Sequence, residues 1–561
     1  MFTLMKQIFL FFACLFLFSS CKKNDSSGNP PGPPVVVPPG FSVSAAKIDG
    51  ATVLNLKYDC NFSPVIQFSF STSINAATLN AALSFRTAQG MQVPFSASLS
   101  NADSTVFIVP NAALPDLSKF SVTVNTSLKS KAGGQLLSAL TINFITKIDS
   151  TDKFPVITDD ALLTKVQQQT FKYFWDFAHP VSGLARERNT SGDVVTSGGS
   201  GFGIMAIPVG INRNFISRSE GLQRMQTIVS FLNNTAQTFH GAYPHWLNGN
   251  SGAVVPFSAN DNGADLVETS YLIMGLLCAR QYFDAAGTDE TTLRDDINFI
   301  VNRVEWDWFR RGGQNVLYWH WSPTVNWAMN LPIKGWNECL VTYILAASSV
   351  THGIAPVVYE QGWKGGSGYF NGNSYYGYPL PLGPNLGGPM FFSHYSFLGI
   401  NPVGLQEAGV SFETQTKNHA LINFNYCKAN PLSNYGYSAL CWGLTASDIP
   451  NGYTASSPTN DVGVIAPTAA IASLPYTPAE SLQALKFYYY KLGDKLWGQY
   501  GFVDAFSLKD LWFANSYLAI DQGPIIVMIE NYRSGLLWNL FTGCPEVKAG
   551  MLSLGFTAPY L

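Results

Sequence analysis

The sequence predicts an N-terminal all-β immunoglobulin-like sandwich followed by a larger all-α catalytic domain of the (α/α)6 toroid type. Short stretches of alternating polar and apolar residues within 41–148 predict the strands. From Asp159 onward, apolar residues recur at spacings of three and four, which predicts amphipathic helices. No Val- and Ile-rich strands alternate regularly with these helices, so we expect neither a TIM barrel nor a Rossmann sheet.

The first 40 residues have the pattern of a bacterial lipoprotein. Residues 1–20 contain an apolar run at 8–18 and small residues directly before Cys21, as in a signal peptide that is cleaved and lipidated at that cysteine. An ordinary cleaved signal followed by an incidental cysteine is the alternative. Residues 21–40 would be the lipidated cysteine and a Pro/Gly-rich tether. We therefore expect a lipid anchor in the cell envelope, at the outer membrane, on its periplasmic or outer face.

The region 41–148 is expected to form about seven short strands, as in an immunoglobulin-like sandwich. Its segments Phe68-Ser-Phe-Ser, Phe120-Ser-Val-Thr-Val and Phe144-Ile-Thr146 resemble those of bacterial Ig-like domains. No cluster of chemically active residues stands out there. We expect a spacer rather than a sugar-binding module.

The region 155–561 is expected to be the catalytic domain. Its predicted helices cover 162–178, 220–239, 264–286, 291–309, 337–350, 404–428, 479–497 and 524–541, with shorter candidates at 357–363, 466–473 and 546–554. About eleven or twelve helices fit six antiparallel pairs closed into a ring, whose loops gather around a cleft at one end. The glycine-rich segment within 190–216 and the segment 362–402 are predicted to be long loops, the second forming a wall of the cleft.

Composition limits the possible partners. Only 12% of the residues are charged and the formal net charge is −3, so we expect no nucleic acid partner. Aromatic residues make up 14% of the chain, and such rings stack on sugar faces or fill a large core. The cysteines after the signal lie far apart with no Cys-x-x-Cys, so neither a zinc site nor a dense disulfide framework is expected. No cluster of metal ligands stands out and no cofactor is expected, with calcium at an Asp/Asn loop as the alternative. We expect a monomer.

Four carboxylates stand out in this charge-poor chain: Asp261, Asp265 and Glu268 in one segment, and Glu338 after Gly335-Trp-Asn. A helix beginning near Gly263 would direct the side chains of Asp265 and Glu268 to the same side. Such crowding keeps at least one proton bound near neutral pH, as a general acid requires. The alternatives are that Asp265 only caps its helix and that Glu268 pairs with an arginine, either Arg280 or Arg186.

From about Leu162 to Leu554 the chain resembles the glycoamylase-like domain of glycoside hydrolase family 144. The resemblance is carried by Thr170-Phe-Lys-Tyr-Phe-Trp-Asp176, Gly183-Leu-Ala-Arg-Glu-Arg188, Gly241-Ala-Tyr-Pro-His-Trp246, the segment 261–268, Gly335-Trp-Asn-Glu338, Trp442-Gly-Leu-Thr-Ala-Ser-Asp448 and Asp521-Gln-Gly-Pro524. It implies an (α/α)6 fold and hydrolysis of a glucan, most of all β-1,2-glucan. The chain has Val503 and Asp504 where relatives commonly have Tyr or Phe and Glu, so a role carried over to Asp504 is in doubt.

Glycosidic bonds are cleaved by a carboxylic acid that protonates the leaving oxygen and a carboxylate that activates water or attacks the sugar. We predict Glu338 as the acid, because neighbouring tryptophans would desolvate it. Asp261, Asp265, Glu268 and Asp448 are the candidates for the second role. The predicted substrate-binding residues are Arg186, His245, Trp246, Trp319, His320, Trp336, His394, Tyr395 and Trp442. For the aromatic and histidine residues a place in the core is the alternative.

Other functions remain open. A surface glycan-binding lipoprotein would need the aromatic cleft but no acid pair. Another glucosidase or a transglycosylase would use the same carboxylates. A lyase is not expected, because it would need a basic groove for uronates.

Overall fold

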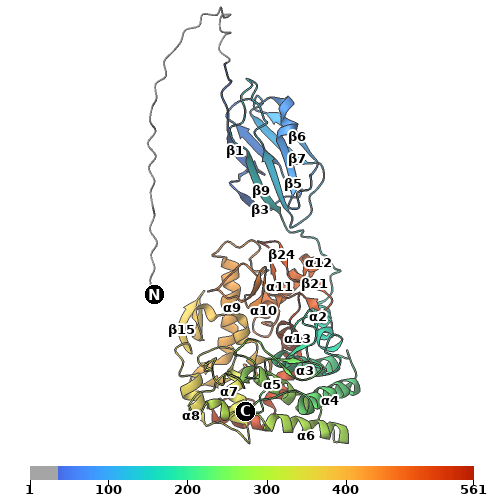
Figure 1. Cartoon of the computed structure of the whole chain (residues 1–561), viewed down its shortest axis with the longest axis vertical. Coiled ribbons are helices and arrows are strands. Elements are labelled where there is room, and N and C mark those ends of the chain that lie inside the picture. The colour runs from blue at the N-terminus through green and yellow to red at the C-terminus, as the bar shows by residue number, and fades with distance from the viewer. Residues whose placement is uncertain (1–35) are drawn as a thin grey trace, which may run out of the picture. The chain divides into compact units, whose positions relative to one another are not determined.

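The computed structural model describes residues 36–561, which form two compact units (Figure 1). One unit holds most of the chain up to Phe144, and the other holds Ile145–Leu561 with two short earlier segments. The predicted signal peptide, Cys21 and most of the tether lie outside the described residues. Among the described helices, none combines the length and the hydrophobicity that a membrane span requires.

The N-terminal unit is built from two antiparallel sheets. One has the strand order β2-β1-β4-β7-β6 and the other β3-β9-β8-β5. The strands are β1 (Val43–Ile48), β2 (Ala51–Thr52), β3 (Leu56–Cys60), β4 (Ile66–Phe70), β5 (Leu83–Thr87), β6 (Phe95–Ser100), β7 (Thr105–Pro110), β8 (Lys119–Val124) and β9 (Leu140–Thr146), with a short helix α1 (Leu79–Ala82). In β4, the apolar residues of the alternating pattern are the buried ones, which confirms the predicted β-sheet region.

The second unit is mainly helical, as predicted. Its helices are α2 (Asp159–Trp175), α3 (Ser197–Asn212), α4 (Arg218–Asn234), α5 (Leu266–Tyr282), α6 (Thr288–Asn302), α7 (Leu340–Ser348), α8 (Pro356–Val358), α9 (Phe412–Ala429), α10 (Pro467–Ile471), α11 (Pro478–Lys486), α12 (Gly493–Leu496), α13 (Ala519–Ser534), α14 (Leu536–Thr542) and α15 (Pro545–Ser553). The single helix predicted over 524–541 is two helices, because Gly535 adopts a left-handed conformation that ends α13.

Short strands connect these helices and carry much of the site. They are β10 (Val194–Thr196), β11 (Trp246–Asn248), β12 (Val254–Val255), β13 (Ala264–Asp265), β14 (His320–Trp321), β15 (Phe370–Tyr375), β16 (Tyr378–Leu382), β17 (Gln406–Glu407), β18 (Val410–Ser411), β19 (Ala446–Ile449), β20 (Gly452–Ala455), β21 (Trp497–Gly498), β22 (Gly501–Phe502), β23 (Phe506–Ser507) and β24 (Trp512–Phe513). Apart from the sheet β10-β11-β12, they pair two by two as antiparallel ladders.

The helices differ in how far they are buried. Nearly all residues of α3, α5, α7 and α13 are buried, whereas α2, α4 and α6 bury one face each. The buried helix α3 packs against both α5 and α13, and the amphipathic α2 packs against α13. The helical unit therefore has an inner, apolar set of helices and an outer, amphipathic set.

The prediction of a loop at the glycine-rich segment was wrong, because this segment is the first half of α3. A Cβ on Gly201 would lie 2.2 Å from the carbonyl oxygen of Tyr271, and one on Gly275 would lie 2.2 Å from the carbonyl oxygen of Gly201. The glycines thus let the backbones of α3 and α5 touch, and this packing outweighs the low helix propensity of glycine.

The segment 362–402, predicted to be a long loop, contains more regular secondary structure than expected. It contains the hairpin of β15 and β16, followed by short 3₁₀ turns at Asn385–Gly387, Met390–Ser393 and Ser396–Leu398. Only part of this segment approaches the site described below.

Candidate active site

The candidate site begins at the N-terminus of α5, where Asp265 is the cap residue. Its Oδ1 accepts hydrogen bonds from the backbone N–H groups of Val267 at 3.0 Å and Glu268 at 2.9 Å. The helix therefore begins at Leu266 rather than near Gly263. The capping role considered from the sequence is present, and the second carboxylate oxygen remains for other partners.

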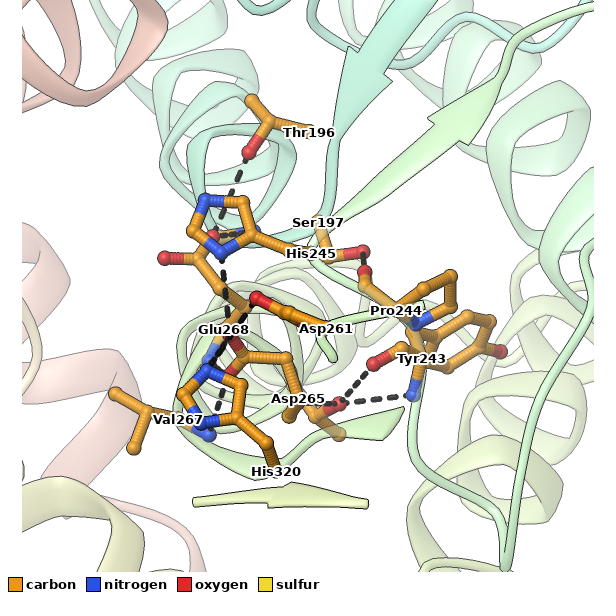
Figure 2. Close-up of polar contacts among 12 residues, drawn as sticks. Thr196, Ser197, Tyr243, Pro244, His245, Asp261, Asp265, Val267, Glu268 and His320 are labelled. Atoms are coloured by element: carbon orange, nitrogen blue, oxygen red, sulfur yellow. Dashed lines mark hydrogen bonds and ion pairs between the residues drawn. The ribbon is translucent and has the colours of Figure 1, made fainter. Parts of the chain in front are cut away.

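Two histidines approach that second oxygen (Figure 2). Nδ1 of His245 lies 3.1 Å and Nε2 of His320 lies 3.4 Å from Oδ2 of Asp265, and the same Nε2 lies 3.5 Å from Oδ2 of Asp261. The pairing of β13 with β14 sets His320 directly opposite Asp265. Two predicted catalytic acids and two predicted substrate-binding histidines thus form one cluster.

Within the cluster, the pKa values of Asp261 and Asp265 are shifted in opposite directions. Burial raises the pKa of Asp265, but the charges and hydrogen bonds of His320 and His245 outweigh burial and hold it well below its usual range. Burial, reinforced by the charge of Asp265, raises the pKa of Asp261 to about 6. Burial lowers the pKa of His245, but the charges of Glu268 and Asp265 prevail and raise it to about 9. One acid is therefore held ionised while its neighbour keeps a proton to higher pH.

Glu268 belongs to the first turn of α5, and its carboxyl group reaches the N-terminus of α3. Its Oε2 accepts hydrogen bonds from the N–H of Gly198 at 2.9 Å and from the hydroxyl of Thr196 at 3.4 Å. Figure 2 shows its other carboxyl oxygen pointing away from these partners. Burial and the charge of Asp265 raise the pKa of Glu268, although the charge of His245 opposes them. The alternative of an ion pair between Glu268 and Arg280 or Arg186 is wrong, since Arg280 bonds Glu546 at 2.5 Å and the guanidinium of Arg186 lies over the ring of Phe177.

Glu338 lies close to this cluster, just before α7. Burial raises the pKa of its carboxyl group to about 7, and the charges of Glu268 and Asp265 contribute. Its backbone carbonyl accepts hydrogen bonds from the hydroxyls of Tyr271 and Ser396. Glu338 is thus a further desolvated acid beside Asp261 and Glu268, but its side chain does not line the pocket described next.

A pocket of about 320 Å³ opens beside Glu268. The residues that line it include Glu187, His245, Trp246, Phe257, Tyr395 and Tyr453. The volume and the mixture of aromatic and ionisable groups are typical of a small-molecule site. Of the predicted residues, Glu268, His245, Trp246 and Tyr395 meet on its wall.

A second polar network centres on Arg188, which also lines this pocket. The guanidinium donates from Nε to Glu187 at 2.9 and 3.0 Å, and from Nη1 to both oxygens of Asp448 at 3.1 and 3.2 Å. Ser516 donates its hydroxyl to Asp448 at 2.5 Å. Asp448, a predicted candidate for the base, is thus already engaged by two donors.

Sequence reasoning missed a buried acid pair behind this network. Oδ2 of Asp504 accepts the N–H of Asp448 at 2.7 Å. Burial raises the pKa of Asp504 to about 7, and burial together with the charge of Asp504 raises that of Asp521 well above its usual range. Two buried acids whose charges oppose each other do not both ionise readily, so at least one of them keeps its proton to higher pH. The motifs quoted for the resemblance contained these positions but gave no sign of their contact.

Three predicted substrate-binding residues lie in the core instead. Burial lowers the pKa of His394 to about 3, and its Nε2 bonds Ser473 at 3.0 Å. Trp336 is 3% exposed and packs near other rings, and Trp442 is fully buried with its indole N–H donating to a backbone carbonyl. Their places in Gly-rich stretches suggested exposure, but the segments around them fold inward.

Two further predicted residues lie beside the pocket rather than on its wall. The guanidinium of Arg186 stacks on the ring of Phe177, 4.7 Å from its centroid, and the neighbouring Arg188 reaches the pocket instead. Trp319 is half-buried, and its ring lies parallel to that of His320 with centroids 5.6 Å apart. Trp319 therefore packs against His320, a member of the histidine–aspartate cluster.

The cluster also has the composition of a cation site, which the sequence did not predict. Donor atoms of His245, Asp261 and Asp265 lie within 4.8 Å of one another. Imidazole and carboxylate groups are ligands for several divalent metals. The direct histidine–aspartate contacts account for the same geometry as ion pairs.

Comparisons with known proteins place this chain in a family. The sequence pattern of the glycoamylase family matches residues 330–545, and that of a bacterial Ig-like domain matches residues 43–146. The structure of an endo-β-1,2-glucanase from Chitinophaga pinensis, in complex with sophorotriose and glucose, is 51% identical in sequence. That likeness covers 72% of this chain and 100% of the other, with a TM-score of 0.70. The chain belongs to the glycoamylase-like family, of the glycoside hydrolase family 144 type.

Further relatives of this glycoamylase-like protein come from Parabacteroides distasonis. One is an exo-β-1,2-glucooligosaccharide sophorohydrolase acting at the non-reducing end, 45% identical over 425 residues. The match covers 72% of this chain and only 58% of that relative's length. The structure of a β-1,2-glucanase from the same species is 36% identical, with a TM-score of 0.70, and covers 92% of this chain and 73% of the other.

Proposed function

We propose that this glycoamylase-like protein hydrolyses β-1,2-glucan, with Glu268 as the proton donor. The observation that carries the proposal is the position of Glu268 on the pocket wall, with burial and Asp265 raising its pKa. A carboxylic acid that keeps its proton to higher pH than usual can protonate a glycosidic oxygen. The relatives that cleave β-1,2-glucan support the choice of linkage.

The second carboxylate is proposed to be Glu187. It lines the same pocket as Glu268, and Arg188 bonds both of its oxygens. Such a charge-assisted pair fixes the position of the carboxyl group, and a positioned carboxylate can activate water or attack the sugar. Asp448 is less suited because it does not line the pocket that holds Glu268, and Asp265 is enclosed by its histidines.

Product analysis on a panel of β-1,2-, β-1,3-, β-1,4- and α-1,4-glucans tests this proposal. We expect oligosaccharides from β-1,2-glucan only, lost in Glu268→Gln with substrate binding retained. Glu338→Gln is the matched variant, because Glu338 is the acid predicted from the sequence. A variant at Glu338 that is inactive beside an active Glu268→Gln would reverse the assignment. Binding without hydrolysis by the natural protein would favour the glycan-binding lipoprotein.

We also propose that the helices close into an (α/α)6 toroid. The inner set of buried helices and the outer set of amphipathic helices support this architecture. An experimental structure in which the inner helices do not form a closed ring would contradict it.

The lipid anchor at Cys21 remains a proposal as well, with location at the outer membrane and the Ig-like domain as a spacer. It rests on the signal-like residues before the cysteine. Labelling of cells with a clickable fatty acid should mark the natural protein and not Cys21→Ser. We further propose a monomer, which light scattering during size-exclusion chromatography would test.

A further inference from the structure

A second pocket, of about 410 Å³, is lined by Arg188, Asp448 and Ser516 of the Arg188 network. The hairpin of β19 and β20 contributes Asp448 and Pro450 to its wall, and β24 contributes Trp512 and Phe513. Arg188 lines both this pocket and the one beside Glu268. A ligand long enough to pass Arg188 would therefore contact both pockets.

The second pocket offers the two kinds of group that bind sugars. Trp512 and Phe513 are half-buried, so part of each ring is open to a ligand, and aromatic rings of this kind stack on the apolar face of a sugar. Arg188 is 30% exposed and uses Nε and Nη1 for its carboxylate partners. Among the described residues no hydrogen bond uses its Nη2, which leaves a fixed donor for a sugar hydroxyl.

The polar wall is held rigidly. Asp448 is fixed by Arg188 and Ser516 on its side chain and by Asp504 on its backbone N–H. A carboxylate held in this way keeps its remaining lone pairs in a set direction, so little conformational entropy is lost when a hydroxyl donates to it.

We propose that this second pocket binds further glucosyl residues of the same glucan chain, beyond those held beside Glu268, with Trp512 as the stacking platform. The inference rests on the proposed glucan hydrolysis and adds to it a dependence on chain length. Substrates that reach past Arg188 gain the contacts of the second pocket, whereas the shortest oligosaccharides do not. The catalytic efficiency should therefore rise with chain length until the second pocket is filled.

The test measures kcat/KM on β-1,2-linked glucooligosaccharides of increasing length. We expect Trp512→Ala to lower kcat/KM about five- to ten-fold on long chains, through KM, and to leave the shortest cleaved substrate unchanged. Trp512→Phe should recover part of the loss, because it keeps a smaller ring and the β23–β24 hairpin. Phe299→Ala is the matched control: Phe299 is 60% exposed, on α6, and lines neither pocket.

Binding to the inactive Glu268→Gln variant separates this inference from the proposed reaction. Titration calorimetry should show tighter binding of long than of short oligosaccharides, and Trp512→Ala on the same background should abolish that difference. An equal loss for all lengths in both Trp512 variants, or no loss at all, would overturn the second pocket as a binding subsite. Absence of hydrolysis by the natural protein, with the length-dependent binding intact, would instead refute the proposed reaction.

Discussion

At the scale of single residues, Asp265 combines a structural and an electrostatic role. One oxygen caps α5 and the other meets the two histidines. The spacing of Asp261, Asp265 and Glu268 was enough to predict crowded acids with unequal protonation. The histidine partners could not be predicted, because His320 reaches Asp265 only through a strand pairing between segments more than fifty residues apart.

The two roles can be separated by substitution. Asn caps helices about as well as Asp, whereas Ala does not. Both Asp265→Asn and Asp265→Ala should lower the pKa of His245 from about 9, as followed by NMR. Asp265→Ala should be less stable to denaturant by about a further 1 kcal/mol. Equal stability of the two variants would show that the cap contributes nothing.

The pH dependence of the reaction should report Glu268. The raised pKa of this acid keeps it protonated to higher pH than an ordinary Glu, so kcat should fall only as the pH rises through that raised pKa. Because the charge of His245 lowers the pKa of Glu268, the alkaline limb of the kcat profile should move to higher pH in His245→Asn. A limb that stays in place or moves to lower pH would contradict this role of His245.

At the scale of elements, the approach of α3 to α5 builds the site. The first turn of α3 donates the N–H of Gly198 to Glu268, so the packing of the two helices positions the proposed acid. The sequence showed the glycine-rich run but not its conformation, because glycines are common in loops and also occur where backbones touch. The deciding information was the facing glycine on α5, which lies more than seventy residues away.

A methyl group at this contact should be costly. Gly201→Ala should lower the free energy of unfolding by about 1–3 kcal/mol or more, because the Cβ would overlap backbone atoms of α5. Gly368→Ala is the control, since nothing lies within 4 Å of a Cβ built there. Chemical denaturation of both variants measures the difference, and equal stabilities would contradict the close helix contact.

At the scale of the whole molecule, the order of an all-β region and a helical region could be predicted from periodicity alone. The sequence could not, however, predict which aromatic residues face the pocket. Trp246 and Trp442 both lie in aromatic, polar segments, yet one lines the pocket and the other is fully buried. Burial depends on how loops fold back onto the helices, which local sequence patterns do not encode.

The helical domain should act without the Ig-like domain. The match to the structure of the Chitinophaga pinensis relative uses 72% of this chain and covers 100% of that relative's chain. That structure therefore contains a unit of comparable extent without a further domain. We expect a truncated chain of residues 150–561 to fold and to retain kcat/KM on soluble β-1,2-glucan. Loss of activity in a folded truncated chain, as judged by circular dichroism, would show that the N-terminal unit does more than act as a spacer.

The most direct test of the central claim is a time course of products from β-1,2-glucan for the natural protein and Glu268→Gln. We predict oligosaccharide release by the natural protein, and, for the variant, binding of the same glucan without release of products. Unchanged hydrolysis by Glu268→Gln would contradict the assignment of the proton donor, and release of products from another glucan alone would contradict the proposed linkage.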